Sequence, residues 1–139
     1  MIREYGFEKL VVWQNARRLV RDIYSLTKTL PSEERYGLSS QIQRAVVSVG
    51  SNIAEGASRK GNKEQGHFYQ TAYASLMEVL CQLTLCQDLG YITEDSYRVT
   101  RNSLDTIAYQ LNQLRNAAIS KPSKLSQPRS TKPSQQENQ

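Results

Sequence analysis

The sequence predicts an all-α protein that folds as an antiparallel up-down-up-down four-helix bundle. Four segments of the 139-residue chain repeat apolar residues at the helical period, and short turns containing proline or glycine separate most of them. No segment alternates apolar and polar residues as a strand does, and no internal repeat is present. Because helices joined by short turns pack most simply as antiparallel neighbours, we expect one bundle over residues 1–119.

The first helix is expected from about Phe7 to Leu30, because the residue before Pro31 is driven out of the α region. One side carries an apolar stripe, which is typical of a core-facing helix. The far side gathers four cations within about 100° of arc, with Asp22 as the single acid at its edge. These cations are Arg17, Arg18, Arg21 and Lys28. They form either a solvated face or a strip that binds polyanions, and both hypotheses stay open.

The second helix is expected over residues 38–58 and carries two stripes side by side. One stripe is apolar, and the other is polar but poor in the Lys and Glu of a solvent face: Gln41, Arg44, Ser48, Asn52 and Glu55. Since buried polar groups need partners, the polar stripe favours a hydrogen-bonded seam against another helix, with a solvated face as the alternative. Gly50 costs on the order of 1 kcal/mol relative to Ala in mid-helix, which indicates a close backbone neighbour or a kink.

The third helix is expected over residues 63–89 and is apolar on two opposite sides. A basic turn precedes it, and the cations of this turn belong either to a solvated loop or to a phosphate contact: Arg59, Lys60 and Lys63. The second apolar strip of the helix comprises Ala74, Met77, Cys81 and Leu85. In a chain this short, another copy of the chain most simply covers such a strip, so we expect an oligomer.

Gly90 is expected to end the third helix, and Thr93 to begin the fourth as its N-cap. The fourth helix then runs to about Ile119. Residues 120–139 form a low-complexity segment that cannot bury enough apolar surface to order itself, so we expect a disordered basic tail. This tail holds four Lys/Arg and one Asp/Glu, whereas residues 1–119 hold 14 and 12. The bundle therefore contributes only +2 of the net charge of +5.

The composition argues against a membrane protein and a metalloprotein. No apolar run approaches the ~18–20 residues of a membrane span, and residues 1–7 lack the apolar core of a signal peptide, so we expect a cytoplasmic protein. Cys81 and Cys86 point about 140° apart on one helix and cannot bridge each other. Together with His67 they supply no recognisable metal site, and no cofactor is expected.

One set of polar residues can be weighed either as an active site or as a structural network: Arg44, Asn52, Glu55 and Glu78, with Gln41 beside them. Glu78 is the expected partner of Arg44. Acid–base chemistry would need a nucleophile or a metal near the carboxylates, and neither occurs at a suitable spacing. The paired Glu-x-x-His motifs of di-metal bundles are also missing, because the chain holds a single histidine. These observations favour a structural network, with no catalytic residue and no enzymatic activity.

Five short motifs occur in an order that resembles a known bacterial family. They are Phe7-Glu8-Lys9-Leu10 with Trp13-Gln14, Gln41-Ile42-x-Arg44-Ala45, Ser51-Asn52-Ile53-Ala54-Glu55-Gly56, Ser75-Leu76-x-Glu78 and Leu89-Gly90-Tyr91. Together they are similar to the four-helix-bundle family that includes the 23S rRNA-intervening-sequence proteins and the accessory proteins of diversity-generating retroelements. The resemblance covers residues 5–119. Gly50 with Ser51 departs from it, since relatives often place proline or another small residue there.

The resemblance implies a homopentameric barrel of bundles without catalytic activity. In the retroelement branch the barrel binds nucleic acid and a reverse transcriptase, whereas the intervening-sequence branch is encoded inside an rRNA insertion. The bundle sequence does not separate the two branches. We therefore expect a non-enzymatic oligomeric adaptor that binds RNA or DNA through its backbone charge, and the alternative is a protein–protein scaffold whose cations only solubilise it.

Overall fold

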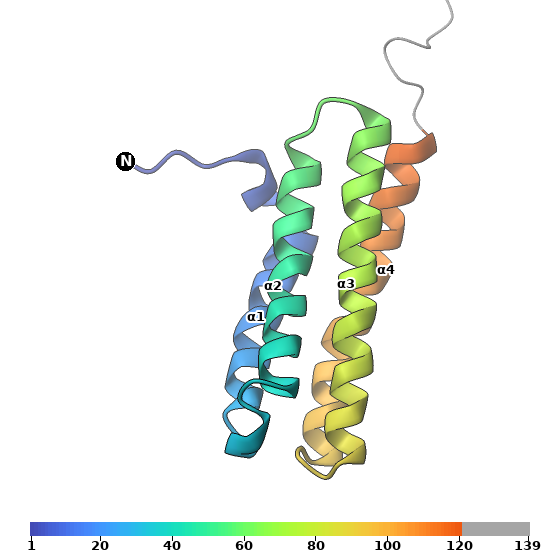
Figure 1. The fold of residues 1–139 in the computed structure, drawn as a ribbon. Coiled ribbons are helices and arrows are strands. Elements are labelled where there is room, and N and C mark those ends of the chain that lie inside the picture. The colour runs from blue at the N-terminus through green and yellow to red at the C-terminus, as the bar shows by residue number, and fades with distance from the viewer. Residues whose placement is uncertain (121–139) are drawn as a thin grey trace, which may run out of the picture.

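The computed structural model describes residues 1–120, which form four helices and no strand (Figure 1). Successive helices run in opposite directions, which confirms the predicted antiparallel bundle. The helices are α1 Val11–Thr27, α2 Leu38–Ala57, α3 Asn62–Asp88 and α4 Glu94–Ser120, with the 3-10 turns η1 Gly6–Lys9 and η2 Ser32–Glu34. Ser120 ends α4, and the rest of the predicted disordered tail, 121–139, lies outside the described residues.

The N-terminal part of the chain differs from the expected single helix over Phe7–Leu30. Leu10 has an extended backbone, with φ −72° and ψ 126°, so that η1 and α1 are separate elements. The side chain of Glu8 fixes η1, because its carboxylate accepts a 2.8 Å hydrogen bond from the N–H of Tyr5. The ring of Phe7 then packs edge-on against Trp13, with 4.9 Å between the centroids. This local packing lies at the start of α1, so the helix begins at Val11 and not at Phe7.

The core is one cluster of apolar side chains that all four helices supply. Its members recur at the helical period, because only side chains three or four positions apart share one face of a helix. Burial of each large side chain stabilises the fold by about 1.5–3 kcal/mol. The largest fully buried side chains include Leu19 and Ile23 of α1, Ile42 and Ile53 of α2, Leu76 and Leu83 of α3, and Leu104, Ile107 and Leu111 of α4.

The turn between α3 and α4 follows the sequence prediction closely. Gly90 has φ +77°, a left-handed conformation that side chains with a Cβ rarely adopt. The N–H of Tyr91 reaches back over this residue to the carbonyl oxygen of Cys86 at 2.9 Å, as in a Schellman motif. Thr93 then caps α4, since its hydroxyl oxygen accepts a 3.1 Å hydrogen bond from the N–H of Ser96.

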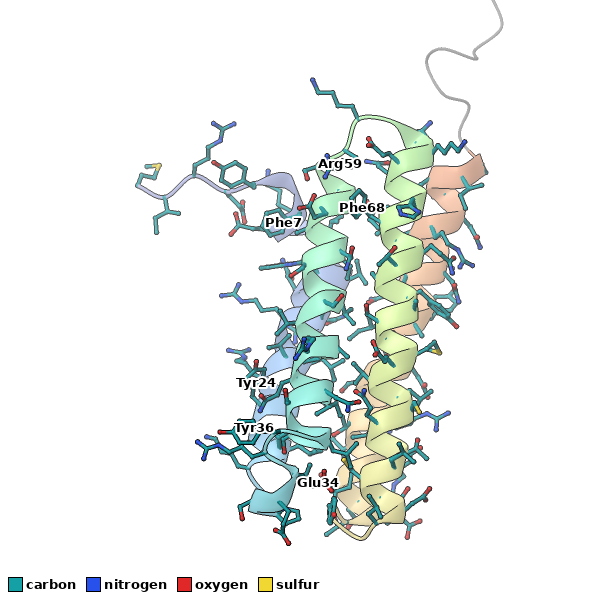
Figure 2. The ribbon with its side chains drawn as sticks, viewed as in Figure 1. Phe7, Tyr24, Glu34, Tyr36, Arg59 and Phe68 are labelled. Atoms are coloured by element: carbon teal, nitrogen blue, oxygen red, sulfur yellow. The ribbon has the colours of Figure 1, made fainter. Side chains whose placement is uncertain are left out.

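Glu34 joins the two turns at this end of the bundle, where Figure 2 shows it near the α3–α4 turn. One carboxylate oxygen accepts a hydrogen bond from the N–H of Leu38 at 3.1 Å, at the start of α2. The other accepts a 3.0 Å hydrogen bond from the hydroxyl of Tyr91. Donation to the carboxylate stabilises the neutral phenol and raises the pKa of Tyr91. None of the described helices has the length and apolarity that a bilayer crossing demands.

Replacement of Glu34 should therefore weaken the fold. Glu34→Ala removes both hydrogen bonds, and we expect it to lower the free energy of unfolding by about 1–2 kcal/mol in urea titrations followed by circular dichroism. Glu33→Ala is the matched control, because this neighbouring carboxylate is exposed and forms no hydrogen bond or ion pair among residues 1–120. An equal loss of stability in both variants would contradict the role of Glu34.

The same contact predicts a pH dependence. The pKa of Tyr91 is higher in the folded protein than its ordinary value of about 10, so its stabilising contribution is complete below that value. The contribution is lost as the pH rises through the raised pKa of the folded state. Between these two values the wild type should lose more stability than Tyr91→Phe, as measured by urea unfolding at each pH. Parallel curves would contradict the hydrogen bond.

Candidate nucleic-acid interface

Three cations follow one another along the outer surface of α1 and its C-cap residue. Arg17, Arg21 and Lys28 are exposed, and none of them forms an ion pair with an acid of the described chain. Their spacing of four and seven residues places them within about 40° of arc on the helix. The guanidinium carbon of Arg17 lies 5.4 Å from the centre of the Trp13 ring, a cation–π distance. These residues form an unneutralised positive stripe, which we call the basic face.

Arg18 belongs to a different side of the same helix. Its guanidinium donates a hydrogen bond to the side chain of Asn15, which in turn donates one of 3.0 Å to Gln110 of α4. Arg18 and Asp22 line a crevice of about 240 Å³ between α1 and α4. The single acid of α1 thus lies beside Arg18 and away from the basic face. Of the four predicted cations of α1, three form one stripe and Arg18 does not join them.

The cations at the basic turn between α2 and α3 are two unpaired lysines and one arginine that is paired with an acid. Lys60 and Lys63 are exposed and form no ion pair with described residues. Arg59 instead pairs with Glu55 at 2.6 Å, and its guanidinium carbon lies 4.8 Å from the centre of the Phe68 ring (Figure 2). The charge of Arg59 is therefore largely neutralised, so the lysines carry the positive potential of this turn.

The predicted polar network is present in part, along the seam between α2 and α3. Asn52 donates hydrogen bonds to the carbonyl and hydroxyl oxygens of Ser48, at 2.9 and 3.1 Å. The Ser48 hydroxyl also bonds to the hydroxyl of Ser75 on α3 at 2.9 Å. One turn from the start of α2, the side chain of Gln82 donates a 3.3 Å hydrogen bond to Gln41. Sequence reasoning missed both α3 partners, although each is buried and polar on an otherwise apolar stripe.

The expected pair of Arg44 and Glu78 is not formed within the chain. Both side chains are exposed, and neither has a hydrogen bond or an ion pair with a described residue. Glu55 bonds to Arg59, just beyond the end of α2, instead of joining the seam. The reason is local, because Arg59 follows four positions along the chain and lies close, whereas a partner on another helix must be reached by a long side chain. The network is thus smaller and uncharged.

The second apolar strip of α3 faces outward from the single chain. Ala74 and Cys81 are exposed, Leu85 keeps 43 % of its surface accessible, and Met77 is half-buried against the edge of the core. In contrast, Cys86 is fully buried, and burial raises the pKa of its thiol. The strip is therefore available to a second molecule, whereas the opposite side of α3 belongs to the core.

The described part of the chain gathers no set of side chains that could hold a metal ion. No three His, Cys, Asp or Glu side chains of residues 1–120 lie close enough to share a metal ion. The side chains with shifted pKa values are structural: burial raises the pKa of Tyr69, and a hydrogen bond with Thr84 lowers that of Tyr97. None of these groups lies on the basic face, so its chemistry is that of a positively charged surface.

The family model of the 23S rRNA-intervening sequence proteins matches residues 8–113. The chain belongs to this family. A solved structure from Bacteroides thetaiotaomicron VPI-5482, described as a protein of unknown function from the S23 ribosomal protein family, has the same fold. It is 25% identical, with a TM-score of 0.71, and the match covers 76% of this chain and 98% of that chain. No curated protein matches the sequence.

The segment shared with the 23S rRNA-intervening sequence family contains the basic face, the polar seam and the apolar strip of α3. It also contains the Asn52-to-Gly56 motif, for which the structure gives a physical reason. A Cβ atom on Gly56 would stand 2.6 Å from the ring of Tyr69 and 3.0 Å from Phe68, where α2 and α3 approach each other. Any larger residue at this position would require the ring of Tyr69 or the packing of the two helices to shift.

Gly50 has a different environment from Gly56. A Cβ atom there would meet only the indole nitrogen of Trp13, at 3.9 Å, and no backbone of another element lies within 4 Å. The close backbone neighbour that the sequence suggested is therefore not present within residues 1–120. Since the space is free and glycine is unfavourable inside a helix, Gly50→Ala should raise the free energy of unfolding by up to about 1 kcal/mol.

Gly56→Ala is the matched control for this prediction. It brings the same gain in helix propensity, but its Cβ atom would clash with the ring of Tyr69, so we expect it to lower the free energy of unfolding. Urea unfolding of both variants provides the comparison. A loss of stability in Gly50→Ala, or a lower molecular mass in solution, would show that the backbone of another copy packs against this glycine. In that case the surroundings of Gly50 would include a neighbouring copy of the chain.

Proposed function

We propose that this protein is a non-enzymatic, homo-oligomeric adaptor that binds RNA or DNA through the phosphate backbone. The observation that carries the proposal is the basic face, where Arg17, Arg21 and Lys28 are exposed and have no acid partner among residues 1–120. Cations that meet phosphates release condensed counterions, and this provides affinity that does not depend on base sequence. Lys60 and Lys63 extend the same potential at the α2–α3 turn.

Assembly would turn this modest charge into a substantial one. We infer that the apolar strip of α3 packs against another copy, because side chains such as Leu85 lose unfavourable contact with water there. The resemblance found in the sequence implies a pentamer. A ring of five copies repeats the basic face five times, so one polyanion can meet several faces at once.

The resemblance also supplies a partner for the adaptor, a reverse transcriptase of a diversity-generating retroelement. The second candidate is a scaffold that binds proteins only, and the exposed apolar strip supports it as well. The basic face favours the adaptor, because a scaffold has no need of cations that lack acid neighbours along one stripe. Mobility-shift assays at low and at physiological salt separate these functions, since only the adaptor retards RNA or DNA.

Removal of the basic face should weaken nucleic-acid binding and leave the fold intact. In the variant that combines Arg17→Ala, Arg21→Ala and Lys28→Ala, we expect the slope of log K against log salt to fall by about one for each lost phosphate contact. Fluorescence anisotropy over a salt series measures this slope. Circular dichroism should show unchanged helicity, because all three side chains are exposed.

A second triple variant on α4 serves as the charge-matched control. Arg98 is already paired with Asp95, Arg101 is bonded to Tyr97 and Asp105, and Arg115 is bonded to Gln70. Replacement of these three arginines by alanine removes the same charge, but from side chains that already have partners. Equal losses of affinity in both triple variants would contradict a localised site, and binding that stays flat as salt rises would contradict the adaptor.

A charge placed in the apolar strip should break the assembly. Met77→Asp and, independently, Cys81→Asp put a carboxylate between apolar surfaces, and we expect smaller species in multi-angle light scattering. Val99→Asp is the control, because this side chain on α4 is 67% exposed and lies outside the strip. An unchanged mass in both strip variants would show that copies meet through another surface.

A further inference from the structure

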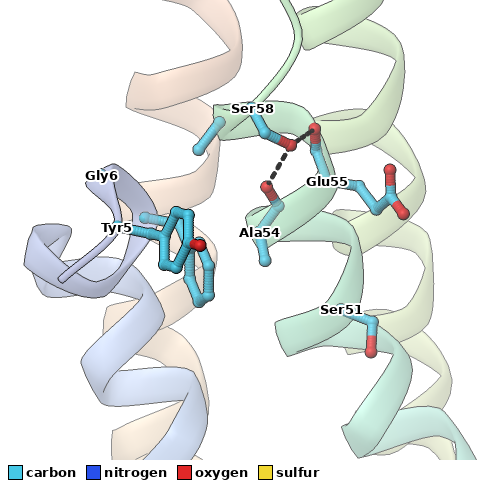
Figure 3. A pocket seen from close by; sticks show the side chains of 8 residues that line it. Tyr5, Gly6, Ser51, Ala54, Glu55 and Ser58 are labelled. Atoms are coloured by element: carbon cyan, nitrogen blue, oxygen red, sulfur yellow. Dashed lines mark hydrogen bonds between the residues drawn. The ribbon is translucent and has the colours of Figure 1, made fainter. Parts of the chain in front are cut away.

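Three hollows follow the line where α1 and α2 meet on the surface. The first lies at the α1–α2 turn and has about 440 Å³, and its lining includes Tyr24, Lys28, Arg35, Ser39 and Gln43. The second hollow lies between Trp13 and Arg17 of α1 and Val47 and Ser51 of α2, and has about 350 Å³. The third lies where η1 meets the end of α2, with the ring of Tyr5 facing Ala54 (Figure 3). We call this series of hollows the α1/α2 groove.

The α1 side of the groove carries aromatic rings and cations in one row. Trp13, Arg17, Arg21, Tyr24 and Lys28 are spaced by four, four, three and four residues, which places them within about 80° of arc. The stretch from Trp13 to Lys28 is about 22 Å long at the helical rise. Tyr24 keeps 42% of its surface exposed, and its hydroxyl has no hydrogen bond with a described residue. Its ring is therefore available to a ligand.

The α2 side of the groove carries no charged side chain next to the hollow at the α1–α2 turn or next to the second hollow. It consists of small, hydroxyl, amide and apolar side chains, among them Ser39, Gln43, Val47 and Ala54. The residues that line these two hollows include no carboxylate. Glu55 borders the third hollow, but its carboxylate is paired with Arg59. A phosphate chain that lies in the groove would thus meet cations on one side and no unpaired acid on the other.

The α1–α2 turn adds another cation beside an aromatic ring. Arg35 lines the hollow at this turn, and its guanidinium carbon lies 5.8 Å from the centre of the Tyr36 ring. That ring is 87% exposed, and Figure 2 places it at the same end of the bundle as Tyr24. Aromatic rings with cations beside them are what single-stranded binders present to unstacked bases, because each base offers a face and each linkage a phosphate.

We propose that the α1/α2 groove is a track for single-stranded nucleic acid. Bases stack on Trp13 and Tyr24, and phosphates contact Arg17, Lys28 and Arg35. This inference rests on the proposed nucleic-acid binding and deepens it, since backbone electrostatics alone do not distinguish single strands from duplexes. A duplex keeps its base faces stacked inside, so it can use the cations of the groove but not its rings.

The test compares Tyr24→Leu with Tyr109→Leu as a matched control, because Tyr109 is an exposed tyrosine of α4 outside the groove. Three ligands are used on the full-length assembly: a single-stranded DNA of about 12 nucleotides, an abasic strand of equal length and a duplex of that sequence. Fluorescence anisotropy should show single-stranded binding weakened about fivefold or more in Tyr24→Leu only. Binding of the abasic strand and the duplex should not change.

Trp13 provides a second measurement on the unmodified protein. It is the single tryptophan of the chain and lies in the groove, so tryptophan fluorescence, excited selectively over the tyrosines, reports on ligands there. The single strand should quench this fluorescence, and the abasic strand should not. This readout does not depend on a variant, and so it also tests the track if Tyr24→Leu folds poorly.

Each remaining outcome overturns a different statement. Equal affinity for single strand and duplex, with no effect of Tyr24→Leu and no quenching, overturns the track but leaves the electrostatic adaptor in place. No binding of any of the three ligands, at low salt, overturns the proposed function and the track together. Quenching of Trp13 by an acidic peptide, without quenching by the single strand, assigns the groove to a protein partner and overturns the track.

Discussion

The rotation of α1 about its own axis is the constraint on which the surface chemistry depends. Burial fixes that rotation, because Ala16, Leu19 and Ile23 keep at most 1% of their surface exposed and any turn of the helix would expose them. Because the apolar side chains of α1 face the core, Arg17 and the other residues of the basic face must border α2, and Arg18 must border α4. The core thus decides which cations lie together, although none of them contributes to it.

The acidic residues neutralise two arginines of α4 but leave most of the cations along α1 without an acid partner among the described residues. On α4, Arg98 and Arg101 lie within one helical turn of Asp95 and Asp105, and both form ion pairs. Exposed pairs of this kind add about 0–1 kcal/mol of stability at most, but they cancel the local field. On α1, the single acid Asp22 lies in the crevice beside Arg18. A bundle that is nearly neutral as a whole therefore keeps one positive face.

The helical period predicted the apolar stripes, and residue preferences at helix ends predicted the left-handed Gly90 and the Thr93 cap, since these features follow from local geometry. It did not predict the break at Leu10, which depends on the contact between Phe7 and Trp13, nor the partner of Glu55. A helical wheel gives the direction of a side chain but not its reach or its competitors. For the same reason the groove was not visible in the sequence, because one of its two sides belongs to α2 and the other to α1.

The proposed interface between copies and the proposed ligand track use different helices. The apolar strip lies on α3, around Cys81, whereas the groove lies between α1 and α2. One chain can therefore pack against its neighbour and hold a strand at the same time. In a ring, a strand released from one groove stays close to the next, and the high effective concentration of neighbouring grooves offsets weak binding at each. Affinity for long strands would then come from assembly, with no need for a strongly charged single chain.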